Sequence, residues 1–338
     1  MSTSSFFTPL SDLAVIEISG ADAASFLHGQ LSHDMSSLAP GQARLAGYCT
    51  AKGRLLGSMV VWSVISAEVP VLRALIKADI AESIVKRLSM FVLRAKAKLS
   101  VTPIQVLGLS LDHSPGEPAE AAPIQADTML AEQAAKLPGN PLPFTVVHTD
   151  AGDWIAAPRA DGAAVRWWLA AANTLNPDGW PDAANTRWQA ADIAAGLPWV
   201  QTATQEVFIP QTLNLDLIDG VSFTKGCYPG QEVVARSHYR GTVKRRMAYG
   251  LIQNATDIDA IALPGTDTFD DRHPENPAGR VINAAQTPAQ VGTSVDMELI
   301  HILMEVQLTD LPEAQFRLGS ASGPVIKIQP LPYSIEAS

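Results

Sequence analysis

The chain has few cysteines, few aromatic residues and no long hydrophobic run. Its two cysteines, Cys49 and Cys227, lie far apart and form no CxxC pair. This excludes a cysteine framework of the kind that stabilises small secreted domains, and it favours a reducing compartment. Aromatic residues make up 6% of the chain, which disfavours a single-strand nucleic-acid binder built on base stacking. The most apolar windows, near 55–65 and 299–308, fall short of the roughly 20 residues that a membrane-spanning helix needs.

Positive charge is also scarce. Lys and Arg total 24 against 34 Asp and Glu, so the formal net charge is -10 and the sequence pI is about 5.1. A protein whose whole surface grips nucleic acid needs a basic face, so direct nucleic-acid binding is not favoured. The start lacks the basic segment and apolar run of a secretory signal, and the first basic residue is Arg44. These features predict a cytoplasmic protein without a membrane partner.

What the chain does have is enough apolar material for several cores. It contains 338 residues, of which 47% are hydrophobic and 17% charged. At about 100–200 residues per domain, this length predicts two or three domains. The composition excludes global disorder, since a disordered chain combines low hydrophobicity with high net charge.

The first part of the chain mixes strand and helix patterns. We expect strands at 13–20, 43–49, 55–65, 91–101 and 144–157, and helices at 21–31, 74–90, 162–171 and 184–196. Segments 43–49 and 55–65 flank a Lys52-Gly53 turn and form a predicted hairpin. Its second strand is almost continuously apolar, which is typical of a strand buried on both faces.

After Arg246 the pattern changes. Short strand candidates at 248–252, 279–284 and 325–329 are separated by long loops rich in Pro, Gly and Asp. Short strands with frequent turn residues indicate a small all-β barrel or sandwich. The sequence therefore predicts a domain boundary near residue 246.

One window concentrates the chemistry. Residues 225–232 read Lys-Gly-Cys-Tyr-Pro-Gly-Gln-Glu. In Tyr228-Pro-Gly-Gln231, Pro suits the second position of a tight turn and Gly the third, where φ is positive. The residues after it, 231–240, can form a helix with Glu232 in its first turn, where a carboxylate suits the helix dipole.

Basic residues cluster around this window. Six of them lie within 22 residues, with Glu232 the only acid among them: Lys225, Arg236, Arg240, Lys244, Arg245 and Arg246. In so acidic a chain, this indicates an anionic partner. A cysteine between glycines and near a lysine can have a lowered pKa and a reactive thiolate. Three plainer interpretations stay open: Cys227 is a buried apolar residue, the basic run is a solvated face, and Tyr228 and Trp188 simply pack.

The string Lys225-Gly-Cys-Tyr-Pro-Gly-Gln-Glu232, continued by Val-Val-Ala-Arg236, resembles the signature of the YgfZ family of folate-binding proteins, relatives of the glycine-cleavage aminomethyltransferase (T-protein). The resemblance extends over nearly the whole chain. It includes the opening at 18–34, the Lys52-Gly-Arg-Leu-Leu56 segment, 209–216 and the ending Leu331-Pro-Tyr333.

The resemblance implies an α+β fold: a T-protein-like three-domain ring around a folate-binding hole. Residues 1–245 would form an aminomethyltransferase-like folate-binding region of two interleaved α/β subdomains of ferredoxin-like type. We expect 1–55 to combine with 140–200, and 56–139 with 201–245. Residues 246–338 would form the C-terminal β-barrel.

The resemblance also implies a role in iron–sulfur cluster assembly or repair, and through it in tRNA modification. The cofactor would be tetrahydrofolate or a derivative, and the partners iron–sulfur enzymes or assembly factors, together with tRNA-modifying enzymes. Cys227 and Lys225 carry over as the catalytic residues. The expected folate-site residues are Trp188, Leu13, Tyr228, Gly226, Gly230, Gln231, Glu232 and Arg236. No resident metal is expected, since two distant cysteines cannot supply four thiolates.

Three positions depart from the family pattern. Leu13 stands where the family has a second folate-site tryptophan, and Ala194 where relatives carry a carboxylate expected to meet the pterin. Ser58 stands where aminomethyltransferases carry a catalytic aspartate, which removes one candidate for acid–base work.

Three hypotheses follow. The first is a folate-dependent iron–sulfur maintenance factor that uses the Cys227 thiol and draws the folate carboxylates to the 236–246 basic run. The second is a tetrahydrofolate-dependent aminomethyltransferase, and the third a non-catalytic tRNA-binding scaffold. We prefer the first, and whether the protein turns over a substrate stays open.

Overall fold

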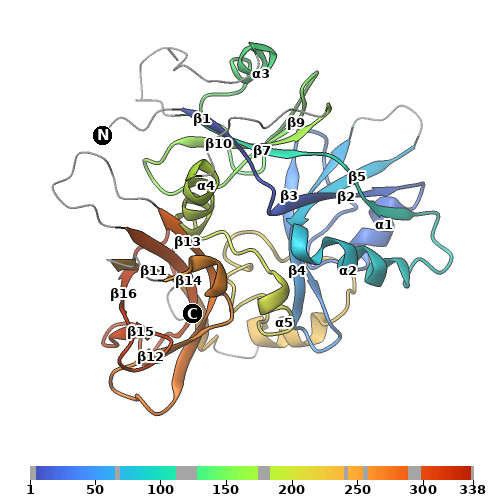
Figure 1. The fold of residues 1–338 in the computed structure, drawn as a ribbon. Helices are drawn as coiled ribbons and strands as arrows, with labels where there is room; N and C mark the ends of the chain where they lie inside the picture. The colour runs from blue at the N-terminus through green and yellow to red at the C-terminus, as the bar shows by residue number, and fades with distance from the viewer. Residues whose placement is uncertain are drawn as a thin grey trace.

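The computed structural model describes residues 5–64, 69–111, 128–173, 183–239, 243–253, 258–287 and 298–335. Within these ranges the chain forms two five-stranded sheets and one closed six-stranded barrel, with antiparallel pairing throughout. In Figure 1 the first sheet is mostly blue, the second mostly green and the barrel orange to red. The described part of the chain holds no helix long and apolar enough to cross a membrane.

The first sheet has the order β3-β4-β5-β2-β6. Its strands are β2 (Leu13–Ser19), β3 (Ala43–Cys49), β4 (Leu55–Val64), β5 (Val71–Lys77) and β6 (Lys98–Val101), and its helices are α1 (Ala23–His28) and α2 (Ala78–Ser89). Both helices share one hydrophobic cluster with this sheet, which includes Leu27 of α1, Ile84 of α2 and Met59 of β4. They therefore cover the same face.

Strand β4 is buried on both faces, as its apolar run predicts. Alternate residues point to two different cores: Met59 and Val61 belong to the cluster under α1 and α2, whereas Val60 and Trp62 belong to the large central cluster. Because successive side chains of a strand point to opposite faces, a strand between two cores must be apolar throughout.

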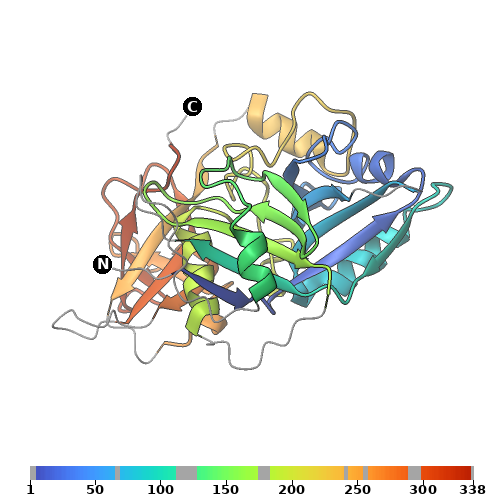
Figure 2. The ribbon, with the colours of Figure 1, turned by 90° about the horizontal axis from the view of Figure 1, so that it is seen from above.

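The second sheet has the order β1-β7-β10-β9-β8. Its strands are β1 (Phe6–Pro9), β7 (Val106–Leu111), β8 (Val146–Thr149), β9 (Gly152–Ala156) and β10 (Val165–Ala171). Helix α3 (Thr128–Ala134) lies between β7 and β8 in the chain, and helix α4 (Ala183–Ala194) follows β10. Figure 2 shows α4 between the green strands and the orange barrel. Trp188 of α4 and Ile282 of the barrel share the central cluster with Trp168 of β10, so α4 joins the second sheet to the barrel.

The barrel has the order β11-β14-β13-β12-β15-β16, and β16 pairs back to β11. Its strands are β11 (Arg245–Gln253), β12 (Asp267–Asp270), β13 (Pro277–Thr287), β14 (Leu299–Gln307), β15 (Phe316–Leu318) and β16 (Val325–Gln329). The short helices η1 (Thr202–Thr204) and η2 (Ala260–Ala262) and helix α5 (Gln231–Tyr239) complete the described elements.

Two sequence expectations were wrong. Residues 162–171, expected as a helix, contain strand β10, every residue of which is buried. Trp168 and Ala170 enter one core and Trp167 and Leu169 another. A short, wholly apolar run gives no periodicity that separates strand from helix. The expected helix 74–90 likewise includes the end of strand β5, and α2 begins only at Ala78.

The sheets also divide the chain differently from the expected pairing of 1–55 with 140–200 and 56–139 with 201–245. Residues 13–101 supply the whole first sheet, whereas β1 joins the sheet built from 106–171. The reason is local pairing: hairpins β3–β4 and β4–β5 keep neighbouring segments in one sheet. Among the described strands, β1 is the one that joins the other part's sheet, by pairing with β7. An isolated bridge between Gln42 and Thr145 also links the two parts.

Candidate functional site

The signature loop, residues 225–230, ends in the turn that its sequence predicts. The backbone N–H of Gln231 donates to the carbonyl oxygen of Tyr228 over 3.2 Å, and Gly230 has a φ of 84°. Only glycine adopts this backbone region without strain. Helix α5 begins directly after the turn and carries Glu232 in its first turn.

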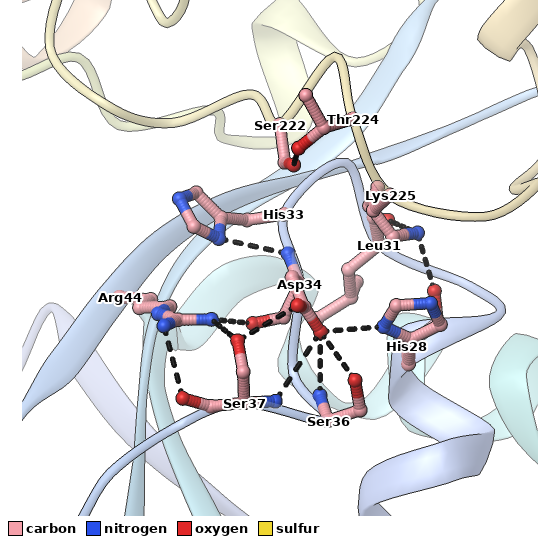
Figure 3. A network of polar contacts seen from close by, with 10 residues as sticks. All are labelled: His28, Leu31, His33, Asp34, Ser36, Ser37, Arg44, Ser222, Thr224 and Lys225. Carbon is pink, nitrogen blue, oxygen red and sulfur yellow. Dashed lines mark hydrogen bonds and ion pairs between the residues drawn. The ribbon is translucent and has the colours of Figure 1, made fainter.

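Lys225 ties this loop to helix α1. Its Nζ donates to the carbonyl oxygens of His28, over 2.5 Å, and Leu31, over 2.9 Å, and lies 4.6 Å from the centroid of the Tyr228 ring. Lysine suits a helix C-terminus because it can satisfy the last carbonyl groups. Burial lowers the pKa of Lys225 to about 8, although the negative charges of Asp34 and Cys227 act in the opposite direction. Figure 3 shows the contacts to α1 and Leu31.

Ser32 fixes the approach to the loop. Its hydroxyl donates to the carbonyl oxygen of Gly220 over 2.6 Å and accepts from the N–H of Gly47 over 2.7 Å. Its own carbonyl oxygen accepts from the N–H of Ser222. One buried serine thus joins strand β3 to the segment that leads into the signature loop.

The two cysteines have opposite surroundings. Cys227 is exposed, and Cys49 is buried. Burial raises the pKa of the Cys49 thiol to about 12, so this thiol is inert near neutral pH. The interpretation of Cys227 as a buried packing residue is therefore wrong.

A polar network lies beside Lys225 (Figure 3). Asp34 accepts from the hydroxyls of Ser36 and Ser37, at 2.6 and 2.7 Å, and from their backbone N–H groups. Its Oδ1 also contacts Nδ1 of His28 at 2.7 Å. The hydrogen bonds from Ser36 above all, with those from Ser37 and His28, hold the pKa of Asp34 well below its usual range. Asp34 is therefore a carboxylate at every physiological pH.

The basic run does not form one patch. Arg246 is buried against Asp216, with its Nη1 2.6 Å from the carboxylate, and Arg236 pairs with Glu232 on the surface of α5. Arg245 pairs with Glu305, and Arg240 lies outside the described residues. The expectation that this run collects folate carboxylates is therefore wrong for Arg246, whose charge is used inside the protein.

Lys244 and Arg245 instead line an open cavity of about 560 Å³. Two further arginines, Arg54 and Arg280, line it together with acidic residues, among them Glu305. The cavity is therefore mixed in charge.

A second cavity, of about 310 Å³, lies where the three parts of the fold meet. Its lining comes from the first sheet, from α4 with the segment that follows it, and from the barrel. These residues are Asp12, Lys77, Asn185, Gln189, Asp192, Ile193, Leu197, Trp199, Gln201, Ala260, Ile261, Pro264, Asn283 and Ala284. We call it the central cavity. Its volume is at the lower end of the roughly 300–1,000 Å³ of small-molecule sites.

The central cavity offers hydrogen-bond acceptors without partners. Oδ1 of Asp12 and Oδ1 of Asn185 are buried and accept no hydrogen bond within the described structure, while the other oxygen of Asp12 contacts Lys77 at 2.5 Å. A buried acceptor without a partner costs about 1–3 kcal/mol. A ligand with several N–H donors, such as a reduced pterin, would satisfy both once these side chains turn their oxygen atoms toward the cavity.

Asp192 supplies a second carboxylate to this cavity. It contacts Nη1 of Arg166 at 2.6 Å and accepts from Nε1 of Trp199 over 3.0 Å. Burial raises its pKa, and the charge of Arg166 acts in the opposite direction. Asp192 lies two residues before Ala194, so a carboxylate is present in this turn of α4 although Ala194 itself has none.

Trp188 and Leu13, the two positions expected at the folate, are buried in the central hydrophobic cluster. Neither lines the central cavity as described. Trp188 packs closely against Gly108, where an added Cβ would lie 2.5 Å from the indole. Their chain neighbours do line it: Asp12, which precedes Leu13, and Gln189, which follows Trp188. Contact of Leu13 and Trp188 with folate stays a prediction.

The other predicted residues, including Cys227, Lys225, Tyr228, Gly226, Gln231 and Arg236, line neither of the two cavities described above. The thiol and the central cavity are therefore separate features. Sequence reasoning missed Asp12, Lys77, Asn185 and Asp192. Among the described residues, no group of three or more His, Cys, Asp or Glu side chains is arranged to hold a metal ion.

Ser58 has a structural role. It is wholly buried in β4, donates to the carbonyl oxygen of Pro198 over 3.1 Å and accepts from the N–H of Val200 over 3.0 Å. The position that resembles a catalytic aspartate therefore carries a hydroxyl that joins the first sheet to the segment after α4.

Comparisons with known proteins identify relatives of this chain by sequence and by fold. No model of a known protein family matches the chain. The tRNA-modifying protein YgfZ of Klebsiella pneumoniae (strain 342) is 30% identical over 338 residues, which cover 97% of this chain and 92% of that protein. The tRNA-modifying protein YgfZ of Yersinia pseudotuberculosis serotype IB (strain PB1/+) is 30% identical over 253 residues, covering 74% and 72%.

Among solved structures, the glycine cleavage system aminomethyltransferase T from Bartonella henselae superposes with a TM-score of 0.66 at 19% identity. The match covers 97% of this chain and 86% of that one. At this identity the likeness concerns the fold alone. It confirms the predicted T-protein-like architecture with its C-terminal barrel.

Proposed function

Since this chain belongs to the family of the tRNA-modifying protein YgfZ, we propose that it is a cytoplasmic folate-binding protein that supports iron–sulfur cluster assembly or repair through the thiol of Cys227. Its clients would be iron–sulfur enzymes or their assembly factors, including those that modify tRNA. The observation that carries the folate part is the pair of unpartnered acceptors, on Asp12 and Asn185, in the central cavity.

The donor pattern of a reduced pterin suits these acceptors. The pterin ring presents an exocyclic amino group and ring N–H groups, and each can donate to a carboxylate or a carboxamide oxygen. Trp199 and Ile193 add apolar walls beside these polar groups, which is the usual composition of a small-molecule site. When bound, tetrahydrofolate supplies a carrier for a one-carbon unit.

The position of Cys227 favours a macromolecular partner. The thiol is exposed on the signature loop and does not line the central cavity, so a sulfur or iron species carried by another protein can reach it. One exposed and one buried cysteine cannot hold a cluster with four thiolates from a single chain. The cluster or its components are therefore substrate, handled transiently at Cys227.

Aminomethyl transfer is the weaker alternative. Both hydrogen-bonding capacities of the Ser58 hydroxyl serve the fold, and no carboxylate is available at that position for acid–base work. A scaffold that binds tRNA through the basic run is also less favoured, since Arg246 is paired inside the protein.

Two measurements test the proposal. Calorimetric titration with 5-formyltetrahydrofolate, an oxidation-stable reduced folate, should give saturable binding that weakens about tenfold in Asn185→Leu, the equivalent of one lost hydrogen bond. Asn276→Leu, an exposed asparagine of the barrel, is the matched control and should bind normally. Absence of binding at millimolar folate would refute the cavity assignment.

The second measurement is complementation of cells that lack the protein. Cys227→Ala should fail to restore iron–sulfur enzyme activity, whereas Cys49→Ala should restore it. Full rescue by Cys227→Ala would exclude a thiol mechanism.

A further inference from the structure

His28 and Asp34 form a dyad next to the signature loop. Nδ1 of His28 lies 2.7 Å from Oδ1 of Asp34, and the serine hydroxyls and N–H groups around Asp34 keep that carboxylate ionised. A carboxylate can only accept a hydrogen bond, so Nδ1 of His28 carries the hydrogen. In the neutral imidazole, Nε2 then presents its lone pair.

Nε2 lies close to the backbone immediately before Cys227. A Cβ placed on Gly226 would lie 3.5 Å from Nε2 of His28, and apart from the chain neighbours Lys225 and Cys227 no other heavy atom would lie within 4 Å of it. The described residues provide no hydrogen bond to Nε2. Lys225, one residue earlier, is bonded to the carbonyl oxygen of the same histidine. The imidazole and the loop are therefore held against each other at two points.

Cys227 follows Gly226 directly and is exposed. A nucleophilic side chain, a base within reach and a third group that orients the base make up the usual arrangement of an activated thiol. Charged and titratable groups next to the signature loop include Lys225, His28 and Asp34. Lys225 interacts favourably with the negative charge of both Asp34 and Cys227, so its ammonium group also favours a thiolate.

We propose that His28, oriented by Asp34, is the base that takes the proton of the Cys227 thiol. The S–H bond breaks, an N–H bond forms at Nε2, and a thiolate–imidazolium pair results beside the carboxylate of Asp34, without any other reactant. No hydrogen bond joins the thiol to His28 in the described resting structure. The proposal requires the Cys227 side chain to reach Nε2 by rotation on the loop, and catalytic hydrogen bonds commonly tighten only when substrate is bound. This inference rests on the proposed function, in which Cys227 is the working thiol.

The test is the rate of alkylation by iodoacetamide, followed by mass spectrometry between about pH 5 and pH 9, the range in which activated thiols titrate. Folded protein reports on Cys227 alone, because Cys49 is buried and has a pKa of about 12; Cys49→Ala and Cys227→Ala variants verify the assignment. We expect the native protein to be alkylated faster near neutral pH than variants that lack the proposed base.

His28→Gln should slow alkylation near neutral pH about tenfold and move the midpoint upward, as expected for loss of an activating base. Asp34→Asn should act in the same direction to a smaller extent. His273→Gln changes an exposed histidine of the barrel, and its profile should match that of the native protein. Far-ultraviolet circular dichroism establishes that each variant is folded; should His28→Gln not fold, the midpoint of Asp34→Asn decides.

An unchanged pH midpoint of alkylation in folded His28→Gln would overturn the inference. If His28→Gln does not fold, an unchanged midpoint in Asp34→Asn would overturn it. The proposed function fails in a different way. If Cys227→Ala does not complement while His28→Gln keeps the native pH profile, the dyad is wrong and the function stands. If Cys227→Ala complements fully while the pH profile depends on His28, the function is wrong although the proton transfer is real.

Discussion

Gly230 of the signature loop lies directly against Gly53 of the β3–β4 turn. A Cβ on Gly230 would lie 2.7 Å from Cα of Gly53 and 2.5 Å from the carbonyl oxygen of Thr50. Both glycines have a positive φ, 84° and 73°. Gly230, one of the expected folate-site residues, thus makes its close approach to the chain's own turn.

This contact predicts that the two glycines around Cys227 differ in tolerance. Gly230→Ala should lower the free energy of unfolding by about 2–4 kcal/mol, because it adds left-handed strain to a clash with backbone atoms. Gly226→Ala should cost less than about 1 kcal/mol, since its added methyl group meets only the edge of His28 at 3.5 Å. Urea denaturation of both variants checks this, and equal losses would contradict it.

Lys225 predicts a stability change at high pH. Its pKa is lowered from 10.5 to about 8 in the folded protein, so between these values the unfolded chain binds more protons. Stability therefore rises with pH in that window. We compare the protein with Lys225 and the variant Lys225→Met, both carrying Cys227→Ala. From pH 8 to 10.5 the free energy of unfolding of the lysine protein should rise by about 1–2 kcal/mol relative to the methionine variant. This is less than the whole pKa difference would give, because the side chain is partly solvated. A flat difference would show that the ammonium group is not desolvated.

Asp34 predicts a second stability change, in acid, where stability again rises with pH. Its pKa in the folded protein is held below the ordinary value of 3.8, so its contribution to stability is complete above that value and declines as the pH falls below it. Compared with Asp34→Asn, the native carboxylate should add about 1–3 kcal/mol near neutral pH and clearly less near pH 3. His28→Gln as the common background removes the titration of the imidazole. A difference that persists unchanged at low pH would contradict the ionised network.

The buried ion pair between Arg166 and Asp192 should be costly to break. The side chains of Arg166 and Asp192 are 3% and 6% exposed. Asp192→Asn leaves the buried guanidinium charge without a counter-ion, so the free energy of unfolding should fall by about 3–5 kcal/mol. Glu232→Gln breaks the pair with Arg236, whose side chains are 85% and 68% exposed, and should cost about 0.5 kcal/mol or less. Thermal or urea unfolding compares them, and similar losses would show that Asp192 is not needed to neutralise Arg166.

Much of the signature loop could be predicted from the sequence because its geometry is local. Pro229 and Gly230 specify the turn, and the helix that begins at Gln231 follows from the residues behind it. The role of Lys225 as a tie to α1 could not be predicted, since its acceptors, His28 and Leu31, lie almost two hundred residues earlier in the chain.

The central cavity could not be predicted either. Asp12, Asn185 and Asn283 meet only because the first sheet, α4 and the barrel come together in space, and no spacing in the sequence signals it. Two residues expected from the family resemblance are chain neighbours of residues that line the cavity: Leu13 follows Asp12 and Trp188 precedes Gln189. Whether they contact folate stays a prediction. Strand β10 failed for a different reason: both of its faces are buried, which removes the alternation that distinguishes a strand.

Strand β1 has a consequence for how the protein is made. Phe6–Pro9 is synthesised before the first sheet, yet its partner β7 begins only at Val106, after the complete first sheet has been made. Domains generally fold as units during synthesis, so we expect the first sheet to form on the ribosome while β1 is still unpaired. Phe7, which is buried in the folded protein, is then exposed. A chaperone that binds apolar segments of nascent chains would bind β1 at this stage.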